Sequence, residues 1–225
     1  MKLFFYAAML ISSLTACAQK NNTMSNTPAD QQLAAAIKAD DAVAVANALK
    51  AGAGKEIRDG ENRTPLMNAL YQNRLEAAKV LIRAGASVNA QDRVLNTPFL
   101  YAGASGFTDI VRLCMKSGAD YTIFNRYNGS ALIPACERGH VETVAAILED
   151  KKFPIDHINR LGWTALLEAI ILGNGGKAHT KIVQLLIKAG ADLNIADQNG
   201  ITPLAHARKK GQKEIVILLE NAGAR

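Results

Sequence analysis

Three arginines with almost equal spacing are the residues of this chain best suited to recognition chemistry. Arg93, Arg126 and Arg160 lie 33 and 34 residues apart, each four residues before a Thr or Ser. A guanidinium binds carboxylates and phosphates through paired hydrogen bonds, and Tyr127 and Trp163 next to it belong to the types that dominate protein interfaces. Two interpretations stay open: the arginines form a ladder for an acidic partner, or their stems cover the aromatic rings and keep their charges in water.

Other polar residues do not form a pattern typical of catalysis or of a metal centre. The acidic pairs Asp40-Asp41 and Glu149-Asp150 lie in polar stretches typical of solvated faces. The glycine-rich segment from Gly173 to Lys177 lacks the spacing of a phosphate-binding loop, and no strand leads into it. The histidines show no close spacing to carboxylates of the kind that metal sites use; they are His140, His157, His179 and His206. We therefore expect no enzyme activity, no metal and no cofactor.

The N-terminus predicts export. Lys2 is followed by an apolar run up to Leu14 and by small residues, which is the pattern of a signal peptide over residues 1–16. The run is shorter than the roughly 20 residues that a membrane-spanning helix needs. Leu14-Thr15-Ala16-Cys17 resembles the lipobox of bacterial lipoproteins, and this resemblance implies cleavage before Cys17 and lipidation of its thiol. An ordinary signal peptide, with Cys17 incidental, is the alternative.

Residues 17–30 follow as the lipidated Cys and a tether, because the segment after Cys17 is rich in Asn, Thr, Ser, Gln and Pro and has little to bury. Ala18 stands where lipoproteins kept out of outer-membrane sorting carry Asp. By that resemblance, we expect the periplasmic face of the outer membrane. A secreted periplasmic protein or a Gram-positive surface lipoprotein is the alternative location.

Composition predicts one packed domain. The chain has 225 residues, 49% of them hydrophobic, and a formal charge of +6. For an exported chain this excess favours acidic envelope components, so we expect no nucleic acid partner. Cys114 and Cys136 are the cysteines left for the domain; buried free thiols are one interpretation and a disulfide is the other.

Two series of residues share one period and predict a repeat protein. Tripeptides that suit the start of a helix recur 33, 33, 34 and 38 residues apart, with Thr as a helix cap and Pro in the first turn; they begin at Thr64, Thr97, Ser130, Thr164 and Thr202. Glycines that suit the end of a helix recur in phase with them; they are Gly52, Gly85, Gly118, Gly190 and Gly223. An apolar stripe of helical period lies between the two signals in each unit.

These motifs resemble the ankyrin repeat over nearly the whole mature chain. The best matches are Gly118-Ala119-Asp120, Gly139-His140-Val141-Glu142 and the segment from Asp197 to Leu204. The resemblance implies an all-α solenoid of about six helix-turn-helix units with hairpin-like connections. Residues 31–225 then divide into an N-terminal capping repeat, four repeats and a C-terminal capping repeat, at 31–58, 59–91, 92–124, 125–158, 159–196 and 197–225.

Several departures from the family pattern lead to expectations about local structure. The position three residues after each Thr or Ser lacks the usual His, so we expect the polar network of that His to be absent; it holds Met67, Leu100, Ile133, Leu167 and Ala205. Lys151-Lys152-Phe153-Pro154 replaces the helix-ending Gly of the fourth unit and predicts a distorted turn. Five extra residues near Gly173 predict a longer loop in the fifth unit.

The resemblance implies a function in binding, because the turn tips and first helices of such stacks line a concave surface. We expect Arg93, Arg126, Tyr127, Arg160 and Trp163 to contact another protein, with the chain acting as a scaffold, inhibitor or immunity-type binder. A binder of an anionic envelope ligand, such as lipopolysaccharide or peptidoglycan, is the alternative. Ile217 replaces mostly polar residues of earlier units and forms a candidate docking edge, unless the Lys213 stem covers it.

Overall fold

The computed structural model describes residues 27–225, so the predicted signal peptide and Cys17 lie outside the described residues. Within this range the chain forms α-helices and turns, and no strand. The helices form six consecutive pairs: Pro28–Ala39 (α1) and Ala42–Lys50 (α2), Pro65–Tyr71 (α3) and Leu75–Arg83 (α4), Pro98–Ser105 (α5) and Thr108–Lys116 (α6), Leu132–Glu137 (α7) and Val141–Ile147 (α8), Ala165–Ile171 (α9) and Lys177–Ala189 (α10), Pro203–Lys209 (α11) and Lys213–Asn221 (α12).

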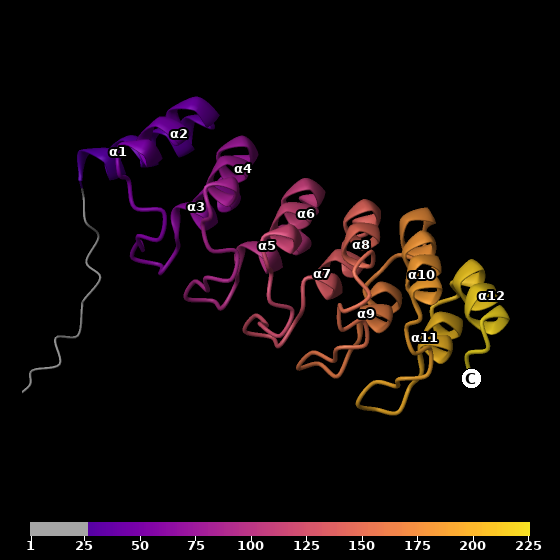
Figure 1. Ribbon diagram of the computed structural model, residues 1–225. Helices are drawn as coiled ribbons and strands as arrows, with labels where there is room; N and C mark the ends of the chain where they lie inside the picture. Colours follow the sequence, from indigo (N-terminus) through magenta and orange to yellow (C-terminus); the bar gives the residue numbers. More distant parts are fainter. Residues whose placement is uncertain (1–26) are drawn as a thin grey trace, which may run out of the picture.

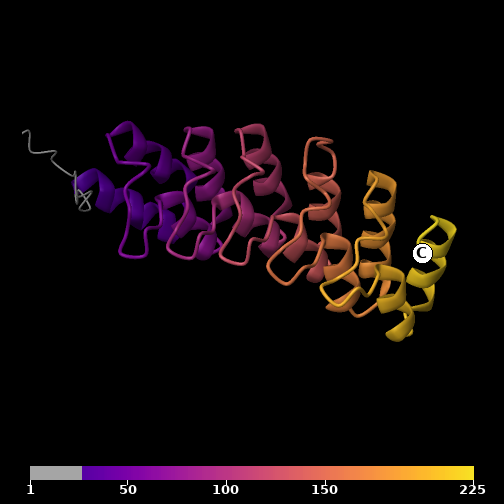
Figure 2. The ribbon, with the colours of Figure 1, turned by 90° about the horizontal axis from the view of Figure 1, so that it is seen from below.

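The pairs stack side by side into a curved solenoid (Figures 1 and 2). The first helix of each pair packs on the first helices of its neighbours, as α3 does on α1 and α5, and forms an inner row. The second helices pack in the same way into an outer row, as α4 does on α2 and α6. Between successive pairs the chain runs out into an extended turn, and these turns project from one side of the stack (Figure 1). The expected all-α solenoid is confirmed.

Threonine caps start four of the five inner helices that we expected to be capped by Thr or Ser. Thr97 Oγ1, for example, accepts a hydrogen bond of 3.1 Å from the Leu100 N–H, an interaction worth about 1 kcal/mol. The expectation for Ser130 is wrong, because α7 begins two residues later and has no side-chain cap. Pro134 is the reason: it has no N–H to donate to the Ser130 carbonyl, so the first helical hydrogen bond cannot form.

Glycines in the left-handed region end the outer helices where expected, for example Gly85 with φ 79° and Gly190 with φ 91°. The fourth unit differs, as its missing glycine predicts. Its outer helix α8 ends at Ile147, and the next two backbone hydrogen bonds, from Glu149 and Asp150, are stretched to 3.4 Å. Phe153 closes this distorted turn by inserting into the core against Tyr121, with ring centroids 5.0 Å apart.

Two boundaries differ from those that the sequence predicts. The extra residues of the fifth unit mainly lengthen the outer helix, because α10 has 13 residues whereas α4 has 9. The loop before α10 has five residues, against two or three between the helices of units two, three, four and six, so the expectation of a longer loop is confirmed in part. At the N-terminus, α1 begins at Pro28, inside the segment assigned to the tether. Thr27 and Asp30 form a capping box there, which fixes the start of the helix.

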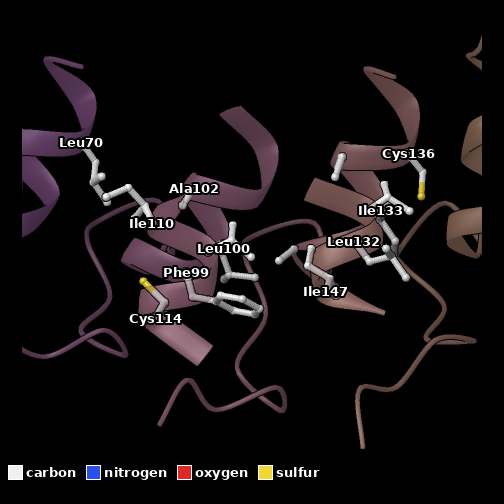
Figure 3. Close-up of a cluster of buried hydrophobic side chains, with 14 of the residues drawn as sticks. Leu70, Phe99, Leu100, Ala102, Ile110, Cys114, Leu132, Ile133, Cys136 and Ile147 are labelled. Carbon is white, nitrogen blue, oxygen red and sulfur yellow. The ribbon is translucent and has the colours of Figure 1, made fainter. Parts of the chain in front are cut away.

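The core runs through the stack between the two helix rows (Figure 3). Every inner helix after α1 has a fully buried alanine five residues after the capping position, and this small side chain lets the helix rows approach closely; these are Ala69, Ala102, Ala135, Ala169 and Ala207. Larger side chains such as Phe99 and Ile147 fill the spaces between units. Cys114 and Cys136 are buried free thiols and lie well apart in Figure 3. Burial raises the pKa of Cys114 to about 12, so this thiol is inert.

Candidate protein-binding surface

The extended turns share one hydrogen-bonded frame, which we number from position 1 to position 5. Position 1 is Asp or Asn, and its Oδ1 accepts from the backbone N–H groups of positions 3 and 5. In the second turn, Asp92 Oδ1 accepts from Val94 at 3.0 Å and from Asn96 at 2.9 Å. The same pair of bonds recurs at Asp59, Asn125, Asn159 and Asp197. Because the frame uses position 1 and the backbone, the side chains at positions 2 and 3 are free to project outward.

Position 4 of every turn is in the left-handed region, and four turns place Asn or Gly there: Asn62, Asn128, Gly162 and Gly200. The second turn instead has Leu95, with φ 61° and a side chain that is 42% exposed. This conformation costs a residue such as leucine about 1 to 2 kcal/mol. Since an exposed side chain recovers little of that cost by packing, Leu95 is a strained residue of the kind that collects at functional sites.

The three expected arginines occupy position 2 of consecutive turns, and all three are exposed. The Arg93 guanidinium lies 3.6 Å from the Glu61 carboxylate of the preceding turn. Arg126 lies over the Tyr127 ring at 4.7 Å and donates to its hydroxyl at 3.1 Å. Arg126 therefore contacts Tyr127 through its guanidinium group and not only through its stem. Backbone bonds join neighbouring turns, from Arg93 to the Glu61 carbonyl at 3.1 Å and from Arg160 to the Tyr127 carbonyl at 2.9 Å.

Apolar side chains gather on the same turns. Leu95, Tyr127, Ile158 and Leu161 are 42%, 56%, 44% and 53% exposed, and they belong to three consecutive turns that also contain the arginines. Sequence analysis identified Tyr127 but missed the other three. Leu161 could have been found because it occupies position 3 of its turn, as Tyr127 does. Leu95 could have been found because the other four turns have Asn or Gly at its position.

Trp163 and Ile217 differ from the rest of the expected surface. Trp163 is at position 5, at the base of its turn, where it is half-buried. No arginine of residues 27–225 stacks on its ring. Ile217 on α12 is 56% exposed, so the Lys213 stem does not cover it. It lies in the C-terminal unit, away from the exposed apolar side chains of the turns.

Polar side chains tie the turns to the helices by bonds that the sequence did not predict. The residue four positions after the cap, rather than three, often contacts position 1 of its own turn: Asn68 donates to Asp59 at 3.1 Å, Asn159 donates to Glu168 at 2.8 Å, and His206 lies 2.8 Å from Asp197. Tyr71 reaches the next turn, donating to Asp92 at 2.7 Å. Burial raises the pKa of Tyr71 to about 12, so it acts as a neutral donor.

Glu168 is the one member of these ties with an unsatisfied group: its Oε2 is buried without a hydrogen-bond partner. Burial, together with the nearby Glu137 carboxylate, raises the pKa of Glu168 to about 7. The Asn159 amide opposes this shift by donating to Oε1. Because Asn159 is also position 1 of the turn that contains Leu161, a titrating group supports the base of the candidate surface.

Residues 27–225 also contain an open cleft away from the turn tips. An open cleft of about 500 Å³ lies between α1 and α3 and is lined by Leu33, Ile37, Ile57 and Arg63, among others. No group of three or more His, Cys, Asp or Glu side chains in this range could hold a metal ion. The helices of the same range are all too short or too polar to cross a membrane.

Comparison with known proteins identifies the repeat. A family model described as ankyrin repeats in three copies matches residues 32–125 and 124–197. The chain is 36% identical over 202 residues to the Escherichia coli (strain K12) ankyrin repeat protein YahD, covering 90% of this chain and 100% of that protein.

Solved structures show the same architecture. An ankyrin repeat domain from Acinetobacter baumannii AYE has a TM-score of 0.81 and 50% identity, covering 86% of this chain and 98% of that domain. The ankyrin repeat domain of Bcl-3, a member of the IκB protein family, has a TM-score of 0.76 and 26% identity, covering 90% of this chain and 89% of that one. Ankyrin repeats bind other proteins and are generally not enzymes. The chain belongs to the ankyrin repeat family.

Proposed function

We propose that this protein is an exported, membrane-anchored ankyrin repeat protein that captures another protein with the tips of its second, third and fourth turns, as a scaffold, an inhibitor or an immunity-type binder. Leu95 is the observation that carries the proposal, because a strained and exposed leucine has no structural use at that position. The anchor would be a lipid on Cys17, and the expected location is the periplasmic face of the outer membrane.

The charge and polarity of the tips support a partner with an apolar patch and acidic groups at its rim. Exposed apolar side chains of three turns supply the area, and the same turns contain three exposed arginines. Position 1 of these turns offers no free carboxylate, because the Asp92 carboxylate is used by its own turn and by Tyr71, while the other two turns have Asn125 and Asn159. Arginine and tyrosine are residue types enriched in interface hot spots.

The test is site-specific photo-crosslinking in the intact native envelope. A photo-reactive amino acid at Tyr127 or Leu161 should crosslink to a discrete protein, while the same probe at exposed Lys116, on an outer helix, should not. Changing Arg93, Arg126 and Arg160 together to Glu should abolish this crosslink and leave the melting temperature intact. An unchanged crosslink in the triple variant would refute the proposal.

Leu95→Asn separates binding from folding, because Asn62 and Asn128 already occupy the same position in other turns. Relief of the left-handed strain should stabilise the domain by about 1 kcal/mol, and the variant should nevertheless bind the partner more weakly. Chemical unfolding and a titration with the crosslinked partner measure the two effects. A variant that is both more stable and equally tight in binding would remove Leu95 from the interface.

Salt dependence tests the alternative of an anionic envelope polymer as ligand. Binding of a polyanion should collapse at moderate ionic strength, whereas an interface centred on apolar side chains should weaken less.

A further inference from the structure

A second charged surface lies at the ends of the helices remote from the turns, in the last two units. It consists of the exposed side chains Lys177, Lys181, Lys209 and Lys213, which we call the lysine edge. Lys177 and Lys213 begin the neighbouring outer helices α10 and α12, which pack against each other. Lys181 lies one helical turn further along α10, and Lys209 ends α11. The last two units therefore carry four exposed lysines near the same ends of three helices.

The loops that precede these helices are fixed to each other. Lys210 Nζ donates to the carbonyls of Ile171 and Gly173 at 2.6 and 2.9 Å. Gln212, which is buried, donates to the Ile170 carbonyl at 3.1 Å. These bonds hold the start of α12 against the loop before α10, so the lysine edge is a fixed arrangement of backbone positions.

The lysine edge has an excess of positive charge over nearby acids. None of its four lysines forms an ion pair within residues 27–225. The outer helices α4, α6 and α8 have an acid in their first turn, namely Glu76, Asp109 and Glu142, whereas α10 has none and α12 has Glu214. Residues 27–158 contain fifteen basic and fifteen acidic residues, whereas residues 159–225 contain nine basic and five acidic ones. The net charge of the described chain is therefore concentrated in its last two units.

We propose that the lysine edge binds the phosphate headgroups of an anionic membrane surface. An ammonium group on a flexible stem binds phosphate as a point charge, without the fixed paired geometry of arginine. That chemistry suits a fluid layer of headgroups better than it suits one rigid protein partner. Lysines near an anionic surface are attracted to it within a Debye length, so four of them on one edge are enough for weak, salt-sensitive binding.

This contact would give the solenoid an orientation, and that consequence rests on the membrane attachment proposed above. The first unit, next to the tether, and the last unit are at opposite ends of the stack (Figure 1). A stack held at both ends would lie along the membrane. The turns begin at the other ends of the helices, so the nine residues of α12 would keep the C-terminal turns about 13 Å from the headgroups.

The test uses the repeat domain alone, residues 27–225, which contains the whole buried core and both terminal units. Co-sedimentation at low ionic strength should show binding to vesicles of phosphatidylcholine with one third phosphatidylglycerol, and none to pure phosphatidylcholine. Changing Lys177, Lys181, Lys209 and Lys213 to Gln should lower the partition coefficient by roughly 600-fold, at roughly fivefold for each lysine.

The matched control removes the same charge at the opposite ends of the outer helices. Lys50, Lys116, Lys151 and Lys188 are exposed and lie at or just after the last turns of α2, α6, α8 and α10. Changing these four to Gln should leave vesicle binding within twofold of the original. An equal loss in both variants would show that only net charge matters, and it would overturn the lysine edge as a site.

Two further outcomes would also refute the proposal. One is no binding of the unaltered domain to the anionic vesicles. The other is displacement from vesicles by inorganic phosphate at constant ionic strength, which would indicate a site for a free phosphate. Since this assay needs neither Cys17 nor the turn tips, its failure is distinguishable from failure of the proposed function. The lysine-edge variant should still form the partner crosslink at Tyr127.

Discussion

Glu168 places a carboxyl group inside the stack with only one of its oxygens hydrogen-bonded. Its pKa is raised from 4.5 to about 7, mainly by burial. A carboxyl group whose pKa is higher in the folded state than in the unfolded state binds a proton on folding. The stability of the domain should therefore fall as pH rises from about 4.5 to about 7, and should stay lower above that range.

Glu168→Gln should remove this pH dependence, because an amide does not ionise. At pH 8 the variant should be more stable by roughly 2 to 3 kcal/mol, and at pH 4 the two proteins should be about equally stable. Urea unfolding at a series of pH values measures the difference. The control is Glu142→Gln on the exposed side of α8, which should keep the original slope; a Glu168→Gln variant with that slope would contradict the assignment.

At the scale of single residues, the sequence predicted which residue types project from the turns better than it predicted their backbone conformations. The arginines were found because they share a position in the repeat, and the structure places them on exposed turns. The strain of Leu95 was missed because apolar residues suggest a core, and only alignment with Asn and Gly reveals that the backbone there is left-handed. The bond between Asn159 and Glu168 was missed because it depends on burial that spacing alone does not show.

The distorted turn of the fourth unit depends on one aromatic side chain. Phe153 is 6% exposed and lies against Phe99 and Tyr121 of the preceding unit. In this unit it closes the end of the outer helix, where other units use a glycine. Phe153 therefore links the helix end to the core of its neighbour.

Phe153→Ala should destabilise the domain by about 3 kcal/mol or more, because it removes buried area and leaves a cavity. Chemical unfolding measures this loss. Leu172→Ala is the control, since Leu172 is 49% exposed and its truncation should change stability by less than about 0.5 kcal/mol. A loss for Phe153→Ala no larger than that of the control would mean that the turn closes without the ring.

At the scale of elements, the sequence predicted that each unit exists and placed its helices, but it did not predict every boundary. The start of α7 depends on a proline four residues after Ser130. This proline lies outside the opening tripeptide, so the repeat pattern did not predict its effect. The extra residues of the fifth unit could form a loop or a helical turn. The glycines there suggested a loop, yet the segment from Lys177 onward continues the helical pattern of α10.

The whole molecule is held together by contacts between neighbouring units, because the helix packing joins each pair to the pairs beside it. Terminal units have one such neighbour and central units have two. In a stack of this kind, stability is approximately a sum of unit terms and interface terms. Opening should therefore begin at the ends.

Native-state hydrogen exchange should be slowest in α5 to α8 and faster in α1, α2, α11 and α12. The reason is that a terminal unit can open by breaking a single interface. Exchange measured by mass spectrometry on short peptides gives the profile along the chain. Equal protection in all six units would indicate that the solenoid opens only as a whole.

The frame of the turns has a consequence for how this protein can change over evolutionary time. Asp92 and its counterparts close each turn by bonds to backbone groups, so the side chains at positions 2 and 3 are not needed to close it. Mutations there can exchange one partner for another without passing through an unstable intermediate. The residues at these two positions can therefore be varied in all five turns to engineer new binders on an unchanged scaffold.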